Sequence, residues 1–123
     1  MSDKPMMNIL LIINDAPYGS EKAYNALRLA MTFQKEHPNV EVRIFLMADA
    51  VFCALPQQKT PDGYYNVERM FKGLVNKGAA IQACGTCADA RGIRPIQFIE
   101  GVEISTMSHL AKWVVEADKV LTF

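Results

Sequence analysis

The sequence predicts an α/β fold in which helices cover a mostly parallel β-sheet. Stretches rich in apolar and β-branched residues alternate with stretches whose apolar side chains recur at helical spacing, and this order is typical of an α/β sandwich. The first stretch, MNILLIIN at residues 7–14, has almost no polar alternation, as expected of a central parallel strand covered on both faces. The chain shows no internal repeat or linker, so we expect a single domain over residues 1–123.

The first half of the chain continues from this strand into a helix and a second strand. The loop DAPYGS contains proline and glycine, and Ser20 is placed to cap a helix over residues 21–36. Apolar side chains recur along that helix at helical spacing, and Pro38 ends it. VEVRIFLM at residues 40–47 is the second predicted strand, and residues 48–55 are expected to form a short helix or turn.

The second half repeats the alternation. We expect a proline-rich loop at 56–63, a helix at 64–77 and a strand at 79–84. After the cysteine segment we expect an irregular segment at 93–104, then a helix that Ser105 or Thr106 caps and that runs to about 117, and finally a strand at 118–123. Three loop segments, at residues 14–20, 48–53 and 84–92, each follow a strand. Because ligands and reacting groups gather outside the carboxyl ends of parallel strands, we expect these segments to converge on one edge.

Composition excludes several classes of function. Lys and Arg number 13, as do Asp and Glu, so the net charge is zero and the sequence lacks the basic excess of a nucleic-acid-binding or membrane-surface protein. The apolar run near the N-terminus is too short to span a bilayer and lacks the charged flank of a signal peptide. We therefore expect a cytoplasmic protein without a nucleic-acid or membrane partner.

Cysteine chemistry is centred on the segment ACGTCADARG at residues 83–92, which contains Cys84 and Cys87. The third cysteine, Cys53, lies in an apolar stretch and is expected to be buried. An odd number of cysteines does not suggest a disulfide framework. A zinc site needs about four ligands, and the sequence has no second CxxC pair. We expect no bound metal and no cofactor.

Two reactive interpretations of the pair remain open on these grounds. In a thioredoxin-like couple, Cys84 would attack and Cys87 would resolve, but Asp89, Arg91 and Gly92 are expected to break up the helix that normally follows such a motif. In a nucleophile or sulfur carrier, Cys84 alone would act at the end of its strand. Backbone N–H groups and Arg91 would then favour its thiolate, whereas a neighbouring Asp89 would oppose ionisation unless it only caps a turn.

Other candidate residues have plainer explanations. Tyr64 and Tyr65 could cover the cysteine edge as a lid or pack an oligomer face, and we favour packing. His109 is placed near the start of a helix, and its spacing to Trp113 predicts a partly buried helix face rather than a catalytic role.

Four segments together resemble the DsrE/DsrF-like family, most closely its YchN-like branch. They are NDAPYGSEKAYNALRLA after the first strand, FLMADAV at the end of the second, CGTCADARGI after the third, and the C-terminal GVEISTMSHLAKWVVEADKVLTF. The resemblance implies a three-layer α/β/α sandwich with a mostly parallel sheet. It also implies a homo-oligomer, either a trimer or a hexamer.

The resemblance also implies a role in sulfur relay. In relay members, a cysteine at this strand end carries a persulfide that it accepts from a sulfur-donor protein and hands to a sulfur-acceptor protein. That cysteine corresponds to Cys84, and Arg91 and Gly92 correspond to a basic-glycine step. Cys87 departs from the relay pattern, which has a small apolar residue there, and it is the candidate resolving cysteine.

The sequence is therefore compatible with three functions. The first is a sulfur-relay protein with possible sulfurtransferase activity, whose turnover as an enzyme or as a stoichiometric carrier stays open. The second is a thiol–disulfide redox protein that uses Cys84 and Cys87. The third is a non-enzymatic oligomeric module for regulation or assembly, in which the cysteines only shape a loop.

Overall fold

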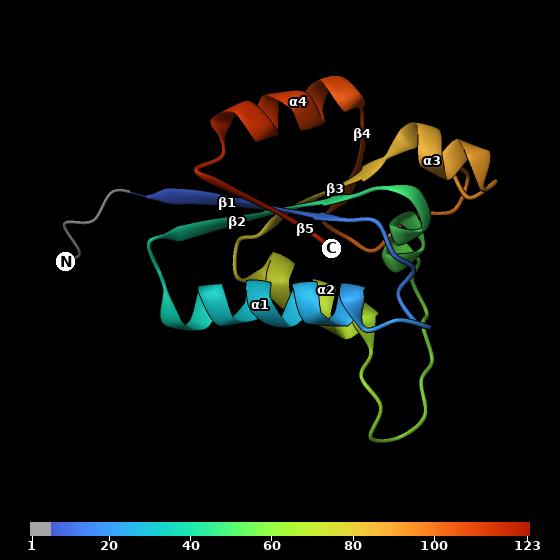
Figure 1. Cartoon of the computed structure of the whole chain (residues 1–123). Coiled ribbons are helices and arrows are strands. Elements are labelled where there is room, and N and C mark those ends of the chain that lie inside the picture. Colours follow the sequence, from blue (N-terminus) through green and yellow to red (C-terminus); the bar gives the residue numbers. More distant parts are fainter. Residues whose placement is uncertain (1–5) are drawn as a thin grey trace.

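The computed structural model describes residues 6–123. Along the chain the elements are β1 (Met7–Ile13), α1 (Lys22–Glu36), β2 (Val40–Leu46), the 3₁₀ helix η1 (Ala48–Ala54), α2 (Val67–Asn76), β3 (Ala80–Cys84), α3 (Gly85–Ala90), β4 (Val102–Ser105), α4 (Met107–Glu116) and β5 (Lys119–Thr122) (Figure 1). Each of these helices is too short or too polar to cross a membrane.

The sheet has five parallel strands in the order β4-β3-β2-β1-β5. Helices α1 and α2 cover one face of the sheet and α4 covers the other, which makes three layers (Figure 1). The predicted α/β/α sandwich with a parallel sheet is confirmed. Because all strands run the same way, their carboxyl ends share one edge, and η1 and α3 lie there.

The core lies on both faces of the central strands. Leu10, Leu11 and Ile13 of β1 are fully buried, which explains the unbroken apolar run that predicted this strand. On the α4 side, Trp113 packs edge-on against Phe45, with ring centroids 6.2 Å apart at 86°. Burying side chains of this size stabilises the fold by roughly 1.5–3 kcal/mol each.

Three local predictions were wrong. Helix α1 begins at Lys22 with Glu21 as its N-cap, and Ser20 instead accepts a hydrogen bond from the Lys22 N–H through its hydroxyl. Asp89 does not break up the turn after the cysteine pair but lies in the short helix α3, which ends at Ala90, just before Arg91 and Gly92. Residues 102–104 of the expected irregular segment form the edge strand β4 together with Ser105. Both elements are short, and β4 exists because it pairs with β3, which no local pattern reveals.

Candidate functional site

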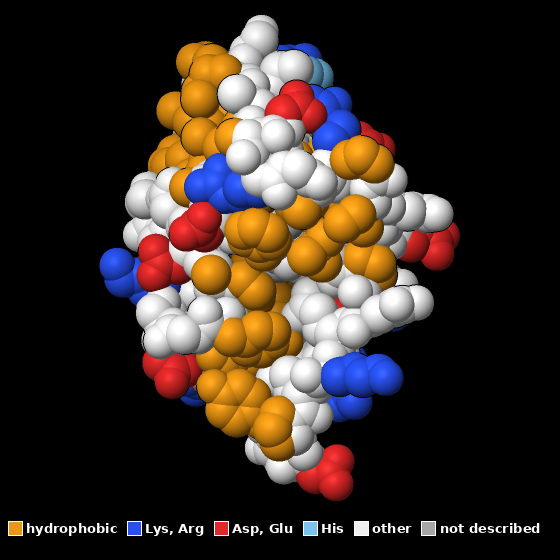
Figure 2. All heavy atoms as spheres, turned by 90° about the vertical axis from the view of Figure 1, so that its right-hand side faces the viewer, with side chains coloured by type: hydrophobic (Ala, Val, Ile, Leu, Met, Phe, Trp, Pro, Cys, Tyr) orange, Lys and Arg blue, Asp and Glu red, His pale blue; other side chains and the backbone are white. Residues whose placement is uncertain are grey.

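The segments that follow β1, β2 and β3 meet at the carboxyl edge of the sheet, as predicted. The backbone N–H of Ala48 in η1 donates to the Cys87 sulfur across 3.3 Å, and the Cys53 thiol donates to the carbonyl of Asp15 across 3.9 Å. Figure 2 views this edge directly and shows a band of hydrophobic side chains that crosses it between charged ones. The cysteine pair therefore lies on the side of the molecule where functional groups of α/β proteins collect.

Cys84 is both the last residue of β3 and the N-cap of α3. Its sulfur accepts a hydrogen bond from the Cys87 N–H at 3.4 Å, so it satisfies a backbone donor that the first turn of a helix leaves free. The side chain is buried, with 5% of the residue exposed. A CxxC spacing thus places one cysteine at the cap and the other in the first turn of the helix.

The Cys84 thiol is not activated in this resting arrangement. Burial is the main cause that raises its pKa, and the neighbouring Cys87 side chain adds to the increase. The backbone N–H groups of Cys87 and Thr86 lower the pKa, in the direction expected from sequence, but they do not outweigh burial. Cys84 is therefore a thiol at neutral pH, and a reaction there must remove its proton.

Cys87 is more exposed than Cys84 and points toward η1. It is half-buried, and its sulfur accepts the N–H of Ala48. Ala48 has φ of +50°, in the left-handed region that non-glycine residues seldom adopt, at a cost of about 1 kcal/mol. The strained residue is thus the one that donates its N–H to the second cysteine.

Arg91 joins α3 to η1 rather than covering Cys84. Its Nε pairs with Oδ1 of Asp49 at 2.9 Å, and its Nη1 donates to the carbonyl of Cys87 at 3.1 Å. The positive charge is therefore already compensated by a carboxylate, and its role here is to hold the turn. Gly92 follows with φ of +68°, the conformation that lets the chain leave α3.

A second arginine beside the site was missed by the sequence interpretation. Nε and Nη2 of Arg94 donate to Oδ1 and Oδ2 of Asp89, each across 3.0 Å. The same guanidinium lies over Gly85, where an added β-carbon would fall 2.5 Å from Nη2 of Arg94 and 3.1 Å from Cγ2 of Ile104. Gly85, between the two cysteines, was the feature of the sequence that could have indicated this contact, because a glycine often marks a position where another group packs closely against the backbone.

Among the described residues, the remaining candidates form no hydrogen bond with Cys84 or Cys87. Cys53 is fully buried, as expected, and burial raises its pKa to about 12. His109 is exposed on α4, so the prediction of a partly buried position was wrong. Tyr65 stacks on Tyr64 within the chain, with ring centroids 4.5 Å apart, and the packing of an oligomer face by these rings stays a prediction.

The described chain offers no obvious place for a metal ion. Within residues 6–123, no three His, Cys, Asp or Glu side chains are grouped closely enough to hold one. Cys84 and Cys87 stand as a pair whose other neighbours are backbone N–H groups and two arginine–carboxylate pairs. This arrangement suits sulfur or thiol chemistry, which needs no further protein ligand.

Comparison with known proteins gives a consistent result. A sequence model of the DsrE/DsrF-like family matches residues 7–123. Protein YchN of Escherichia coli is 45% identical over 118 residues, which cover 96% of this chain and 100% of YchN. An uncharacterized protein of Methanopyrus kandleri is 44% identical, over 94% of this chain and 93% of its own length.

Solved structures agree with these sequence matches. The crystal structure of E. coli YchN superposes with a TM-score of 0.91 at 45% identity and covers 96% of this chain and all of its own. A protein of unknown function from Methanobacterium thermoautotrophicum superposes with a TM-score of 0.69 at 15% identity, over 96% of this chain and 99% of that one. The second match shows the shared fold alone.

Proposed function

Because this chain belongs to the DsrE/DsrF-like family, we propose that it accepts sulfur as a persulfide on Cys84 and passes it to another protein. The observation that carries the proposal is the position of the Cys84 sulfur at the end of β3 and the start of α3, where it accepts the Cys87 N–H. A persulfide anion at this position would meet the same backbone donor and the positive end of the turn.

The transfer is an exchange without net oxidation. The Cys84 sulfur attacks the outer sulfur of a donor persulfide, a new S–S bond forms, and the S–S bond of the donor breaks. The proton of the Cys84 thiol moves to the departing donor sulfur, which leaves as a thiol. An acceptor thiolate then attacks the outer sulfur on Cys84 and restores the original cysteine, so the protein is a carrier.

Cys87 gives this site a second possible outcome. Its thiolate could attack the inner sulfur of a Cys84 persulfide, which would form a Cys84–Cys87 disulfide and release sulfide. The N–H of Cys87 already lies 3.4 Å from the Cys84 sulfur, so the two residues are adjacent in the folded chain. Cys87 therefore decides whether sulfur is handed on or released.

A thiol–disulfide couple is the second candidate function, and α3 favours it. The CxxC motif opens a helix here, contrary to the expectation that weighed against a redox couple. A reversible disulfide between Cys84 and Cys87 with a potential in the range of cellular thiol buffers would support it. A redox titration that finds no such couple would remove this candidate.

The experiment for the carrier function is mass spectrometry after incubation with a cysteine desulfurase and free cysteine. The wild type and the Cys87→Ser variant should each gain the mass of one sulfur atom, and Cys84→Ser should gain none. Peptide mapping locates the added atom. Sulfur that still appears on the Cys84→Ser variant would show that another residue is the acceptor.

Assembly into a homo-oligomer, as a trimer or hexamer, is part of the same proposal. The outer surface of α4 exposes apolar side chains, with Met107 60%, Val114 40% and Val115 86% exposed. A protein of this size seldom leaves several such residues together in water without a partner. Light scattering on the wild type and on Val115→Lys should show a larger species that the substitution weakens, and a monomeric wild type would contradict it.

A further inference from the structure

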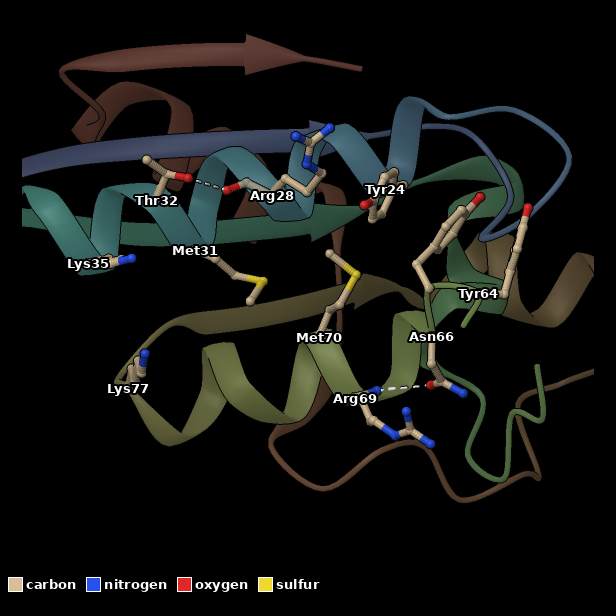
Figure 3. A pocket seen from close by; sticks show the side chains of 11 residues that line it. Tyr24, Arg28, Met31, Thr32, Lys35, Tyr64, Asn66, Arg69, Met70 and Lys77 are labelled. Carbon is tan, nitrogen blue, oxygen red and sulfur yellow. Dashed lines mark hydrogen bonds between the residues drawn. The ribbon is translucent and has the colours of Figure 1, made fainter. Parts of the chain in front are cut away.

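A groove of appreciable size lies between α1 and α2, away from the cysteine pair. Its volume is about 560 Å³, which is within the usual range for small-molecule sites. Figure 3 shows side chains of both helices and of the segment before α2 around it. From Tyr24 to Lys35 the groove follows α1 for about 17 Å, longer than a single small anion requires.

The residues that line the groove include several cations but no carboxylate. Arg28 and Lys35 come from α1, and Arg69 and Lys77 come from α2 and its C-cap. No Asp or Glu lines the groove, and the ion pairs of residues 6–123 all use other cations. In a chain whose acids and bases are equal in number, this is a local excess that an anion would balance.

Helix dipoles explain only half of these cations. Lys35 in the last turn of α1 and Lys77 at the end of α2 lie where a positive charge stabilises a helix. Arg69 is in the first turn of α2, where the dipole disfavours a cation, and its backbone N–H is already bound by the Asn66 side chain. In Figure 3 its guanidinium lies on the side of α2 that faces away from α1, so Lys35 and Lys77, at one end of the groove, are the cations placed to meet a ligand.

The middle and one end of the groove are apolar and aromatic. Met31 and Met70 project toward each other from the two helices (Figure 3). At the end near the start of both helices, Tyr65 stacks between Tyr24, at 4.0 Å between centroids, and Tyr64, at 4.5 Å. Thioethers and tyrosine rings of this kind favour contact with a flat aromatic group.

We propose that this groove binds a nucleoside phosphate, with its ring against the methionines and tyrosines and its phosphates at Lys35 and Lys77. The combination selects this class, because an apolar body alone would leave the cations unpaired and a bare phosphate would leave the apolar half empty. Lysine ammonium groups are common phosphate ligands, and two of them from separate helices match a diphosphate better than a single charge. The proposal does not involve Cys84.

The test is a titration of the full-length protein with ADP by calorimetry at physiological ionic strength, with adenosine and pyrophosphate as separate probes. ADP should bind, and each of the two partial ligands should bind roughly tenfold more weakly. The double variant Lys35→Gln, Lys77→Gln should weaken ADP binding by about tenfold or more. Lys112→Gln on α4 removes an exposed charge outside the groove and should leave the affinity within about twofold.

Proton NMR provides a readout of position. ADP should shift the ring signals of Tyr24, Tyr64 and Tyr65 and leave those of Trp113, on the other side of the sheet, unchanged. The proposal is overturned if ADP does not bind, if pyrophosphate binds as tightly as ADP, or if Lys112→Gln weakens binding as much as the double variant.

Discussion

The substitution Gly85→Ala adds one carbon atom between the two cysteines and so tests how closely other side chains pack there. An alanine there would place its β-carbon 2.5 Å from Nη2 of Arg94 and 3.1 Å from Cγ2 of Ile104. The arginine can swing away, but it would lose its pair with Asp89, which contributes at most about 1 kcal/mol because both groups are exposed. Ile104 must also give way by a few tenths of an ångström, and crowding of this kind costs about 1–3 kcal/mol.

The expected net effect of Gly85→Ala is a loss of about 1 kcal/mol in the free energy of unfolding, after the usual gain of roughly 0.5–1 kcal/mol from replacing glycine. Gly73→Ala is the matched control, because nothing lies within 4 Å of its added β-carbon in α2. That control should stabilise the protein by the same roughly 0.5–1 kcal/mol. Urea denaturation followed by circular dichroism measures both variants.

A double variant separates the two contacts. Adding Arg94→Ala to Gly85→Ala should cost less than the sum of the single substitutions, because the alanine then meets only Ile104. The rate at which Cys84 reacts with a thiol reagent gives a second reading, since a shifted first turn of α3 alters its burial. Equal stabilisation by Gly85→Ala and Gly73→Ala would refute the close approach that we describe.

Three further predictions use the same measurements. Asn66→Ala should lower the free energy of unfolding by about 2–3 kcal/mol, because the buried side chain of this N-cap residue also donates to a carbonyl and a hydroxyl group of the preceding loop. Thr106→Ala removes one exposed capping hydrogen bond and should lower it by about 1 kcal/mol. Burial raises the pKa of Cys53 from 9.0 to about 12, so the unfolded chain ionises first as pH rises. The wild type should therefore lose stability relative to Cys53→Ala between about pH 9 and 12, by up to about 1.4 kcal/mol per pH unit, and a constant difference would contradict this. Arg91→Gln should leave the far-ultraviolet spectrum unchanged but speed proteolysis near η1, because the Asp49 pair is lost.

The elements of the fold that the sequence predicts correctly are those whose residue pattern is set by burial. β1 is covered on both faces, so all its residues except Asn8 are apolar, and the following helices show their buried side chains at regular spacing. The convergence of the strand ends then follows from parallel topology, so the sequence alone predicts the edge of the sheet at which the cysteines lie.

What the sequence could not reveal depends on contacts between distant segments. β4 has only four residues and its middle ones are exposed, so its strand character comes from pairing with β3. Arg94 lies beyond the motif, and its contact with Gly85 depends on the path of the chain after α3. The cations of the groove were visible in the sequence, but only the packing of α1 beside α2 brings Lys35 and Lys77 to one end.

The structure makes the two cysteines unequal in a way that bears on mechanism. Cys84 is buried with a raised pKa, whereas Cys87 is more exposed and accepts a hydrogen bond from a strained residue. The nearby carboxylates of Asp49 and Asp89 are each paired with an arginine, so neither is free to act as a base. In the proposed transfer the proton of Cys84 leaves with the donor sulfur, and the raised pKa then protects the resting thiol from unintended oxidation while a bound donor can still react.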